Sequence, residues 1–335
     1  MGYSIVITLA GIELPQNVTL KLDYGAVVVT NPITLDQGDA LPKGPNATLF
    51  HQPRLSDGSF KEVARFLLGF QLDENLQANN KAIIIAGEAF ALPLRLMTKG
   101  SITVSPAVIS KRPLREILVQ GCESKALLTQ RLHIIVSLSE GDCAEIQRNL
   151  PFLRPPVDWQ VVIDKYTEAY YKQDVVEQSL AFLVALETLV TPSSRSRDRS
   201  SKAQRYAALL ASTGQSEQRC YRKLLKDAYK CRQDIWHGEA DPALVAASKK
   251  WLSEHWEYLR DISRLSLQRA LWLRANDKVS SLSDIAKFID TQRSNAIEIW
   301  DIPVWTIGSL SKLWIPSFSD FEVEATGGAS VSFNV

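Results

Sequence analysis

A pair of residues with chemical potential lies in the segment YKCRQDIWHG, residues 229–238, where Arg232 precedes His237 by five positions. A guanidinium neutralises negative charge on a phosphate, and an imidazole accepts or donates a proton because it titrates near neutral pH. Positions 232 and 237 are separated by about 140° around a helix axis. One helix therefore cannot easily direct both side chains at one atom. Two copies packed about a twofold axis could bring both pairs into one cleft.

The helix expected to carry this pair has two chemically different faces. It begins near Ser216, a good N-cap residue, and ends before Gly238, a residue that favours helix termination. One face is small or apolar and is expected to enter a core; it contains Cys220, Leu224, Ala228, Cys231 and Ile235. The opposite face is polar and mostly cationic; it contains Arg222, Lys226, Lys230, Gln233 and His237. We expect this second face to border solvent or a polar groove.

Positive charge is concentrated before and along this helix. Between residues 195 and 232 there are eleven Lys or Arg and three Asp or Glu, a formal charge of +8 in a chain whose total is +1. The rest of the chain therefore sums to −7. A basic surface of this kind favours an anionic polymer. An ordinary solvated basic helix face is the alternative interpretation.

Glu187 is a single charge in an apolar helical segment, where Leu183 and Leu186 are its neighbours. Such a charge is costly to bury unless it is paired. We expect a cationic partner, either Arg205 or Arg232. The resulting ion pair would either stabilise a helical bundle alone or orient an arginine for chemistry.

The whole chain limits the class of protein. Its 335 residues suit two domains, and 45% hydrophobic and 22% charged residues are ordinary for a soluble globular protein. Four cysteines without CxxC pairing and four histidines far apart in sequence predict no metal site, and we expect no cofactor. No run of about 18 apolar residues is present, so we expect no membrane association. Four unpaired thiols fit the reducing cytoplasm.

The chain divides into regions with different sequence patterns, and the expected fold class is α+β. Residues 1–150 contain short β-branched runs broken by Gly, Pro, Asn and Asp, which predict a mixed β-rich domain serving recognition or structure. KAIIIAGEAFALPLRL is interpreted as one of these strands, whereas residues 60–72 fit a helix or a strand. PFLRPPVDW, residues 151–159, is expected to be a linker because three of its residues are proline.

Residues 158–300 are predicted to form an all-α helical bundle, because several segments there have helical periodicity and good caps. Asp241 and Pro242 provide the N-cap and first turn of a long helix that extends to about residue 275. Residues 301–335 return to strand and loop character and form a C-terminal tail.

Three motifs in order, ALETL (185–189), RYAALL (205–210) and YKCRQDIWHG (229–238), resemble the HEPN family, and most closely its Apea-like branch. The resemblance covers residues 158–275. It implies a homodimer that cleaves RNA without a metal, in defence against phage or as a toxin. It also assigns Arg232 and His237 as the catalytic pair and Gln233 as a polar helper. Two positions depart from the pattern: Gln233 stands where Asn, Asp or His is commoner, and Glu239 stands where the branch regulated by adenylyl transfer has tyrosine.

The chemistry implied by this resemblance suits the residues present. The RNA 2′-hydroxyl would act as nucleophile, histidine would serve as base and acid, and arginine would stabilise the phosphorane. We expect Lys226, Lys230, Arg222 and Arg205 to bind RNA, with Glu187 and Tyr229 in supporting positions. If this part of the chain is a nuclease, the N-terminal domain is expected to have a sensing or regulatory role and to bind a trigger or partner. The alternative is a HEPN-like module without turnover that dimerises and binds RNA or a protein partner.

Overall fold

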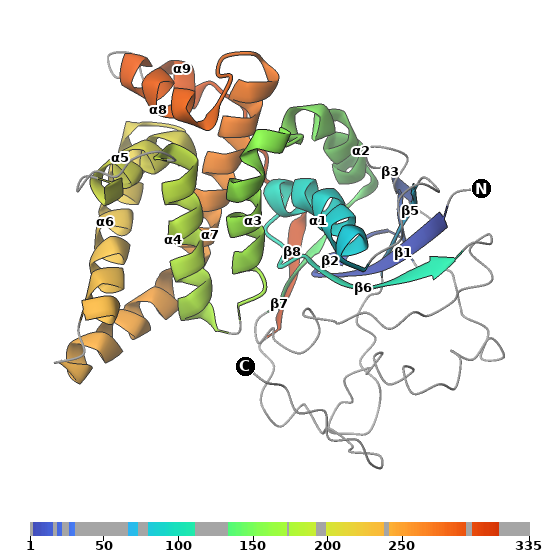
Figure 1. Cartoon of the computed structure of the whole chain (residues 1–335), viewed down its shortest axis with the longest axis horizontal. Coiled ribbons are helices and arrows are strands. Elements are labelled where there is room, and N and C mark those ends of the chain that lie inside the picture. The colour runs from blue at the N-terminus through green and yellow to red at the C-terminus, as the bar shows by residue number, and fades with distance from the viewer. Residues whose placement is uncertain are drawn as a thin grey trace, which may run out of the picture.

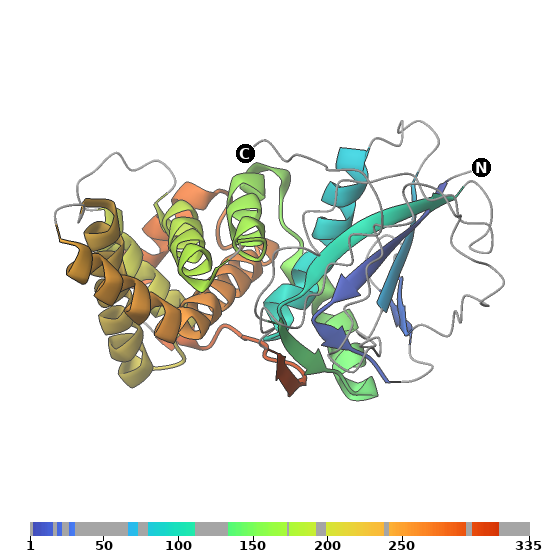
Figure 2. The ribbon, with the colours of Figure 1, turned by 90° about the horizontal axis from the view of Figure 1, so that it is seen from below.

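The computed structural model describes most of the chain, with several gaps in its first half and at its end. The described residues are 3–15, 19–21, 27–30, 66–72, 80–110, 133–172, 174–191, 199–237, 241–292 and 297–314. Within them, a helical bundle lies on one side of the molecule, and two small sheets with two further helices lie on the other (Figures 1 and 2).

The bundle is built around one long helix, α7. Its five main helices are α3 (Gln160–Ala169), α4 (Val175–Val190), α5 (Arg199–Ala211), α6 (Gln215–His237) and α7 (Pro242–Ala275). Helix α7 packs against α4, α5 and α6, and α3 packs against α4. Two short helices, α8 (Leu282–Thr291) and α9 (Ile297–Trp300), contact α4 and α5 near the upper end of the bundle in Figure 1.

Sequence-encoded caps set where these helices begin. The Asp174 side chain accepts a hydrogen bond from the Glu177 amide at the start of α4, and Asp241 accepts one from Leu244 at the start of α7. The predicted long helix from Pro242 to residue 275 is confirmed. Helix α6 begins at Gln215, one residue before the expected Ser216 N-cap.

The sheets lie beside the bundle and include both early and late parts of the chain. One has the strand order β3-β4-β5-β1-β6, and the other has the order β2-β7-β8. The strands are β1 (Tyr3–Ala10), β2 (Ile12–Glu13), β3 (Thr19–Lys21), β4 (Val27–Thr30), β5 (Phe66–Leu72), β6 (Thr103–Ser110), β7 (His133–Ser137) and β8 (Ser309–Trp314). Strand β8 from the C-terminal tail pairs antiparallel with β7, so the described tail returns to the N-terminal region. The segment 60–72 was compatible with a helix or a strand. Its described residues, Phe66–Leu72, form strand β5.

The predicted α+β class with a β-rich N-terminal domain is wrong, because helices dominate the described residues. The segment interpreted as the strand KAIIIAGEAFALPLRL forms an 18-residue helix, α1 (Asn80–Met97). A second helix, α2 (Glu140–Asn149), starts at a Ser139 capping box, and the proposed linker contains two 3₁₀ turns, η3 (Leu150–Leu153) and η4 (Val157–Trp159). EILVQG, residues 116–121, lies outside the described residues.

The error over α1 has a physical reason. Ala91, Leu92, Leu94, Leu96 and Met97 are all fully buried, so this part of α1 has no polar face to produce a 3.6-residue period. A continuously apolar run does not distinguish a buried strand from a buried helix, although its length of more than about ten residues favours a helix.

None of the described helices combines the length and the apolar character needed to cross a membrane.

Candidate active site at the end of helix α6

Helix α6 presents the predicted cationic face to solvent. All five members of that face are exposed: Arg222, Lys226, Lys230, Gln233 and His237. The buried face differs from the prediction, because Cys220 is exposed and Leu224 and Ile235 are only half-buried. Leu225 and Tyr229 are buried instead. The core-facing side of α6 is therefore rotated toward Tyr229, which brings Arg232 against α4.

Arg232 forms an ion pair with Glu187 of α4. The distance from Arg232 Nη1 to Glu187 Oε1 is 2.9 Å, and the two side chains are only 12% and 11% exposed. The predicted cationic partner of Glu187 is thus confirmed as Arg232. Restricted solvent access strengthens their attraction relative to a surface pair. The pair fixes the Arg232 guanidinium between α4 and α6.

Two aromatic rings and α4 complete the surroundings of Arg232. Its guanidinium carbon lies 4.1 Å from the centroid of the Trp236 ring and 5.9 Å from that of Tyr229. The Tyr229 hydroxyl donates to the Leu183 carbonyl at 3.3 Å. Burial raises the pKa of Tyr229 well above its usual value, and the Glu187 charge adds to the rise. Tyr229 is therefore a neutral, fixed wall of the site at neutral pH.

The structure adds Arg199, which the sequence analysis counted only as part of a basic run. Its Nε lies 4.0 Å from Glu187 Oε2 and donates to Thr191 Oγ1 at 3.2 Å. Thr191 is the C-cap of α4, and its hydroxyl donates to the Glu187 carbonyl at 2.7 Å. Glu187 thus faces two arginines from two different helices. One hint of this contact is visible in the sequence: Thr191 and Arg199 are separated by only a short connection between two predicted helices.

His237 and Gln233 are not brought to Arg232 within one chain. Both side chains are exposed on the cationic face of α6, and neither side chain hydrogen-bonds to another described residue. Arg232 instead points toward α4, as its angular separation from His237 requires. Within one chain, the catalytic pair expected from the sequence occupies two adjoining surfaces at the end of α6.

Arg205 lies away from this site. Its guanidinium carbon is 4.9 Å from the Tyr206 ring centroid, and Nη2 donates to the Tyr206 hydroxyl at 3.2 Å. Tyr206 in turn donates to both carboxylate oxygens of Asp290 on α8 at 2.8 Å. Arg205 therefore belongs to the α5–α8 contact and is not the partner of Glu187.

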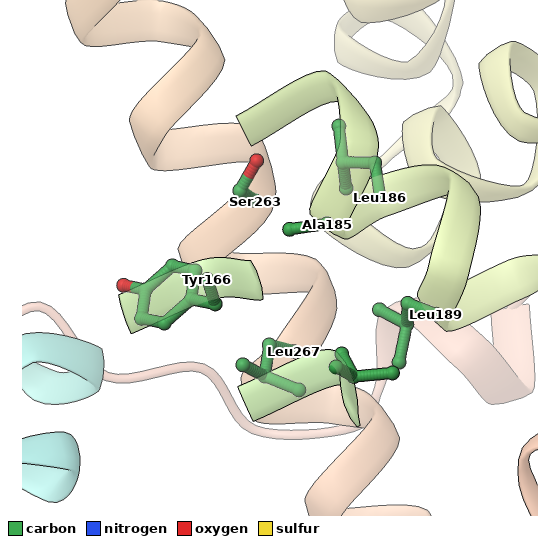
Figure 3. Close-up of a pocket in the computed structure, with 7 residues that line it drawn as sticks. Tyr166, Ala185, Leu186, Leu189, Ser263 and Leu267 are labelled. Atoms are coloured by element: carbon green, nitrogen blue, oxygen red, sulfur yellow. The ribbon is translucent and has the colours of Figure 1, made fainter. Parts of the chain in front are cut away.

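One cavity between helices of the bundle is too small for a substrate. A cavity of about 10 Å³ lies between α3, α4 and α7, lined by Val162, Tyr166, Ala185, Leu186, Leu189, Ser263 and Leu267 (Figure 3). That volume holds one water molecule at most. No group of three or more His, Cys, Asp or Glu side chains suited to a metal ion occurs among the described residues.

Comparisons with known proteins give no family assignment. A scan against protein-family models and searches of curated proteins and of solved structures found no match to this chain.

Proposed function

We propose that this protein is a metal-independent endoribonuclease of HEPN type that acts as a homodimer in the cytoplasm, in defence against phage or as a toxin. The observation that carries the proposal is the Arg232–Glu187 ion pair beside the exposed, cationic end of α6. It supplies a fixed guanidinium next to a surface that bears His237 and three further cations. Fixed positive charge of this kind stabilises a developing phosphorane.

The proposed reaction needs only groups that these residues provide. A histidine removes the proton from the RNA 2′-hydroxyl, whose oxygen attacks the adjacent phosphorus. The bond from phosphorus to the 5′-oxygen breaks, and a second protonated histidine donates a proton to that oxygen. The products are a 2′,3′-cyclic phosphate and a 5′-hydroxyl. A dimer supplies both copies of His237, and Arg232 approaches from the neighbouring surface.

RNA binding is proposed for the exposed face of α6. Arg222, Lys226 and Lys230 lie on successive turns that lead toward His237, so one backbone strand could contact all three. Gln233 lies one turn before His237 and offers an amide to the ribose or phosphate. The N-terminal part of the chain would bind the trigger that controls cleavage.

A cleavage assay in EDTA tests the proposal. The wild type and the variants Arg232→Ala and His237→Ala are incubated with total RNA and transfer RNA, and the product ends are analysed. His255→Ala serves as the matched control, because His255 lies on α7 outside the proposed site and stacks on Trp251. We expect cyclic phosphate ends from the wild type and the control and none from the two site variants. Equal cleavage by all four proteins would refute the assignment.

A binding module without turnover is the alternative, and one observation favours it. The Arg232 guanidinium is already held by Glu187 and stacked on Trp236, as in a bridge that only stabilises the bundle. If no cleavage occurs in any protein while RNA binding is intact in all of them, this alternative is favoured. Expression toxicity of the wild type compared with His237→Ala then separates a scaffold from a nuclease that lacks its activator.

A further inference from the structure

Three arginines are almost completely buried where α1, α3 and α7 meet. Arg95, Arg260 and Arg264 have exposed fractions of 0%, 2% and 1%. Lys99 adds a fourth cation, with its Nζ 3.3 Å from Asp261 Oδ2. We call these four residues the junction cluster, since they lie between the N-terminal region and the bundle.

The carboxylates in contact with the junction cluster do not balance its charge. Glu88 binds Arg95 and the Tyr171 hydroxyl. Asp261 is shared, with an oxygen 3.6 Å from Arg260 Nη2 and 3.5 Å from Arg264 Nε in addition to its contact with Lys99. Among the described residues, four cations are therefore in contact with two carboxylates.

Arg95 and Arg264 have their donors satisfied by fixed oxygen atoms. Arg95 Nε donates to the Ile102 carbonyl at 2.6 Å, and its Nη2 donates to Tyr171 at 3.1 Å. Arg264 donates to the carbonyls of Leu96 and Trp305 at 2.9 and 2.8 Å, and to Thr306 Oγ1 at 2.8 Å. Both side chains thus have a structural role that accounts for their burial.

Arg260 is different. Its Nε and Nη1 are shielded from solvent and have no hydrogen-bond partner among the described residues. Its guanidinium carbon lies 5.0 Å from the Trp256 ring centroid, so the side chain is held in place by stacking. Burying a guanidinium with unsatisfied N–H groups is costly. An apolar side chain of similar length would pack there at lower cost, so packing alone does not account for an arginine.

The neighbouring tyrosines do not supply the missing negative charge. Burial raises the pKa of Tyr170, although the charges of Arg260, Arg95 and Arg264 oppose the rise. Burial also raises the pKa of Tyr166, whose hydroxyl lies 2.9 Å from that of Tyr170. Both phenols are therefore neutral at physiological pH and provide hydroxyl groups only.

We propose that the junction cluster binds a phosphate-class oxyanion, with Arg260 as its principal ligand and Lys99 and Arg95 as supporting charges. A phosphate dianion matches the excess of two positive charges, and one of its oxygens accepts from the Nε–H of Arg260. The bound anion links α1 to α7, the helix that packs against α6.

Thermal unfolding in inorganic phosphate tests this proposal on the whole chain, independently of any RNA cleavage. Phosphate is raised stepwise against sodium chloride at constant ionic strength. Because the ion binds the folded state alone, the Tm of the wild type should rise steadily with the logarithm of phosphate concentration. Arg260→Met should fold and lose this rise. Arg222→Met, which removes an exposed cation of α6, should retain it.

Three outcomes of the unfolding experiment would overturn the proposal: no rise beyond that in chloride, an equal rise in Arg260→Met, or loss of the rise in Arg222→Met. Arg260→Lys keeps the charge but loses two of the donors, and it should weaken phosphate affinity at least about tenfold. Equilibrium dialysis should find one phosphate bound per wild-type chain, and finding none would also exclude the site. A nucleoside monophosphate tested in parallel shows whether the group enters as a free ion or as part of a phosphomonoester.

Discussion

Arg232 and Glu187 meet across α6 and α4 at 2.9 Å, and Arg199 reaches the other carboxylate oxygen at 4.0 Å. One acidic group therefore positions two guanidinium groups from separate helices. Arg232 is nearly buried, whereas the Arg199 side chain is 40% exposed. The arrangement leaves Arg199 freer than Arg232 to exchange its contact with Glu187 for a contact with a ligand.

Glu187→Gln should separate the orienting role of this carboxylate from a purely structural one. The substitution preserves shape but leaves Arg232 without its counter-charge, and we expect a loss of about 2 kcal/mol in unfolding free energy because the pair is nearly but not fully buried. Urea unfolding measures that loss. In the proposed nuclease, cleavage by the folded fraction should also fall through kcat, with KM little changed.

A double-mutant cycle with Arg232→Met provides the control for Glu187→Gln. If the two residues interact directly, the double variant should be more stable than the sum of the single losses predicts. Additive losses would mean that the two residues act independently despite their short separation. Unchanged kcat in folded Glu187→Gln would assign Glu187 to the bundle alone.

His237→Ala should change activity without changing stability. His237 is exposed at the end of α6 and its side chain makes no hydrogen bond to a described residue, so we expect a change below about 0.5 kcal/mol in unfolding free energy. Loss of a general acid and base should reduce cleavage by at least about 10²-fold. Chemical unfolding and a single-turnover assay measure the two effects. A large loss of stability with proportional loss of activity would contradict the catalytic role.

Local sequence signals predicted much of the bundle. The Asp241-Pro242 cap fixed the start of α7, and the polar stripe from Arg222 to His237 gave the exposed face of α6. The partner of Glu187 was predictable because a charge in an apolar segment requires one. Each of these features depends on residues of one helix or on one pair of opposite charges, and such local patterns are visible in the sequence.

Contacts between distant segments were not predictable in the same way. Arg264 donates to the carbonyls of Leu96 and Trp305, and backbone oxygens leave no signature in the sequence. Arg199 approaches Glu187 only because α5 folds back against α4. Helix α1 was misread because burial removed the periodicity on which helix prediction depends.

Alkaline pH should unfold the protein as its buried tyrosines ionise. Burial raises the pKa values of Tyr166, Tyr170 and Tyr229 above 10 in the folded state. Above pH 10 the unfolded chain therefore releases protons that the folded chain retains, so stability is lost as the pH rises through this range. Arg269, whose pKa burial lowers to about 10, acts in the opposite direction but is a single group.

Tyrosinate absorbance and circular dichroism should test this dependence together. We expect the last tyrosinate signal to appear in the same transition as the loss of helical structure. Tyr229→Phe removes one of these three groups and should shift the alkaline midpoint upward. Complete tyrosine titration before any loss of structure would be inconsistent with these raised pKa values.

Arg269→Met should be strongly destabilising, because Arg269 joins the end of α5 to the segment around α9. Its guanidinium is fully buried and donates to the carbonyls of Leu210, Ser212, Trp300 and Ile302. Methionine would leave these acceptors unsatisfied, at a cost of about 3 kcal/mol. Thermal unfolding measures the loss, and hydrogen exchange should increase at residues 297–307. Arg274→Met, on the same helix but partly exposed, should cost much less.

The salt dependence of RNA binding should identify the cations that contact phosphates. In a His237→Ala background, which preserves the RNA, Lys226→Gln and Lys230→Gln should each reduce the slope of log affinity against log salt by about 1. Both lysines are exposed on the face that leads to His237. Lys249→Gln is the matched control, since Lys249 is also exposed but lies on α7. An equal change in all three variants would indicate attraction to the overall charge of the protein rather than to a defined path along α6.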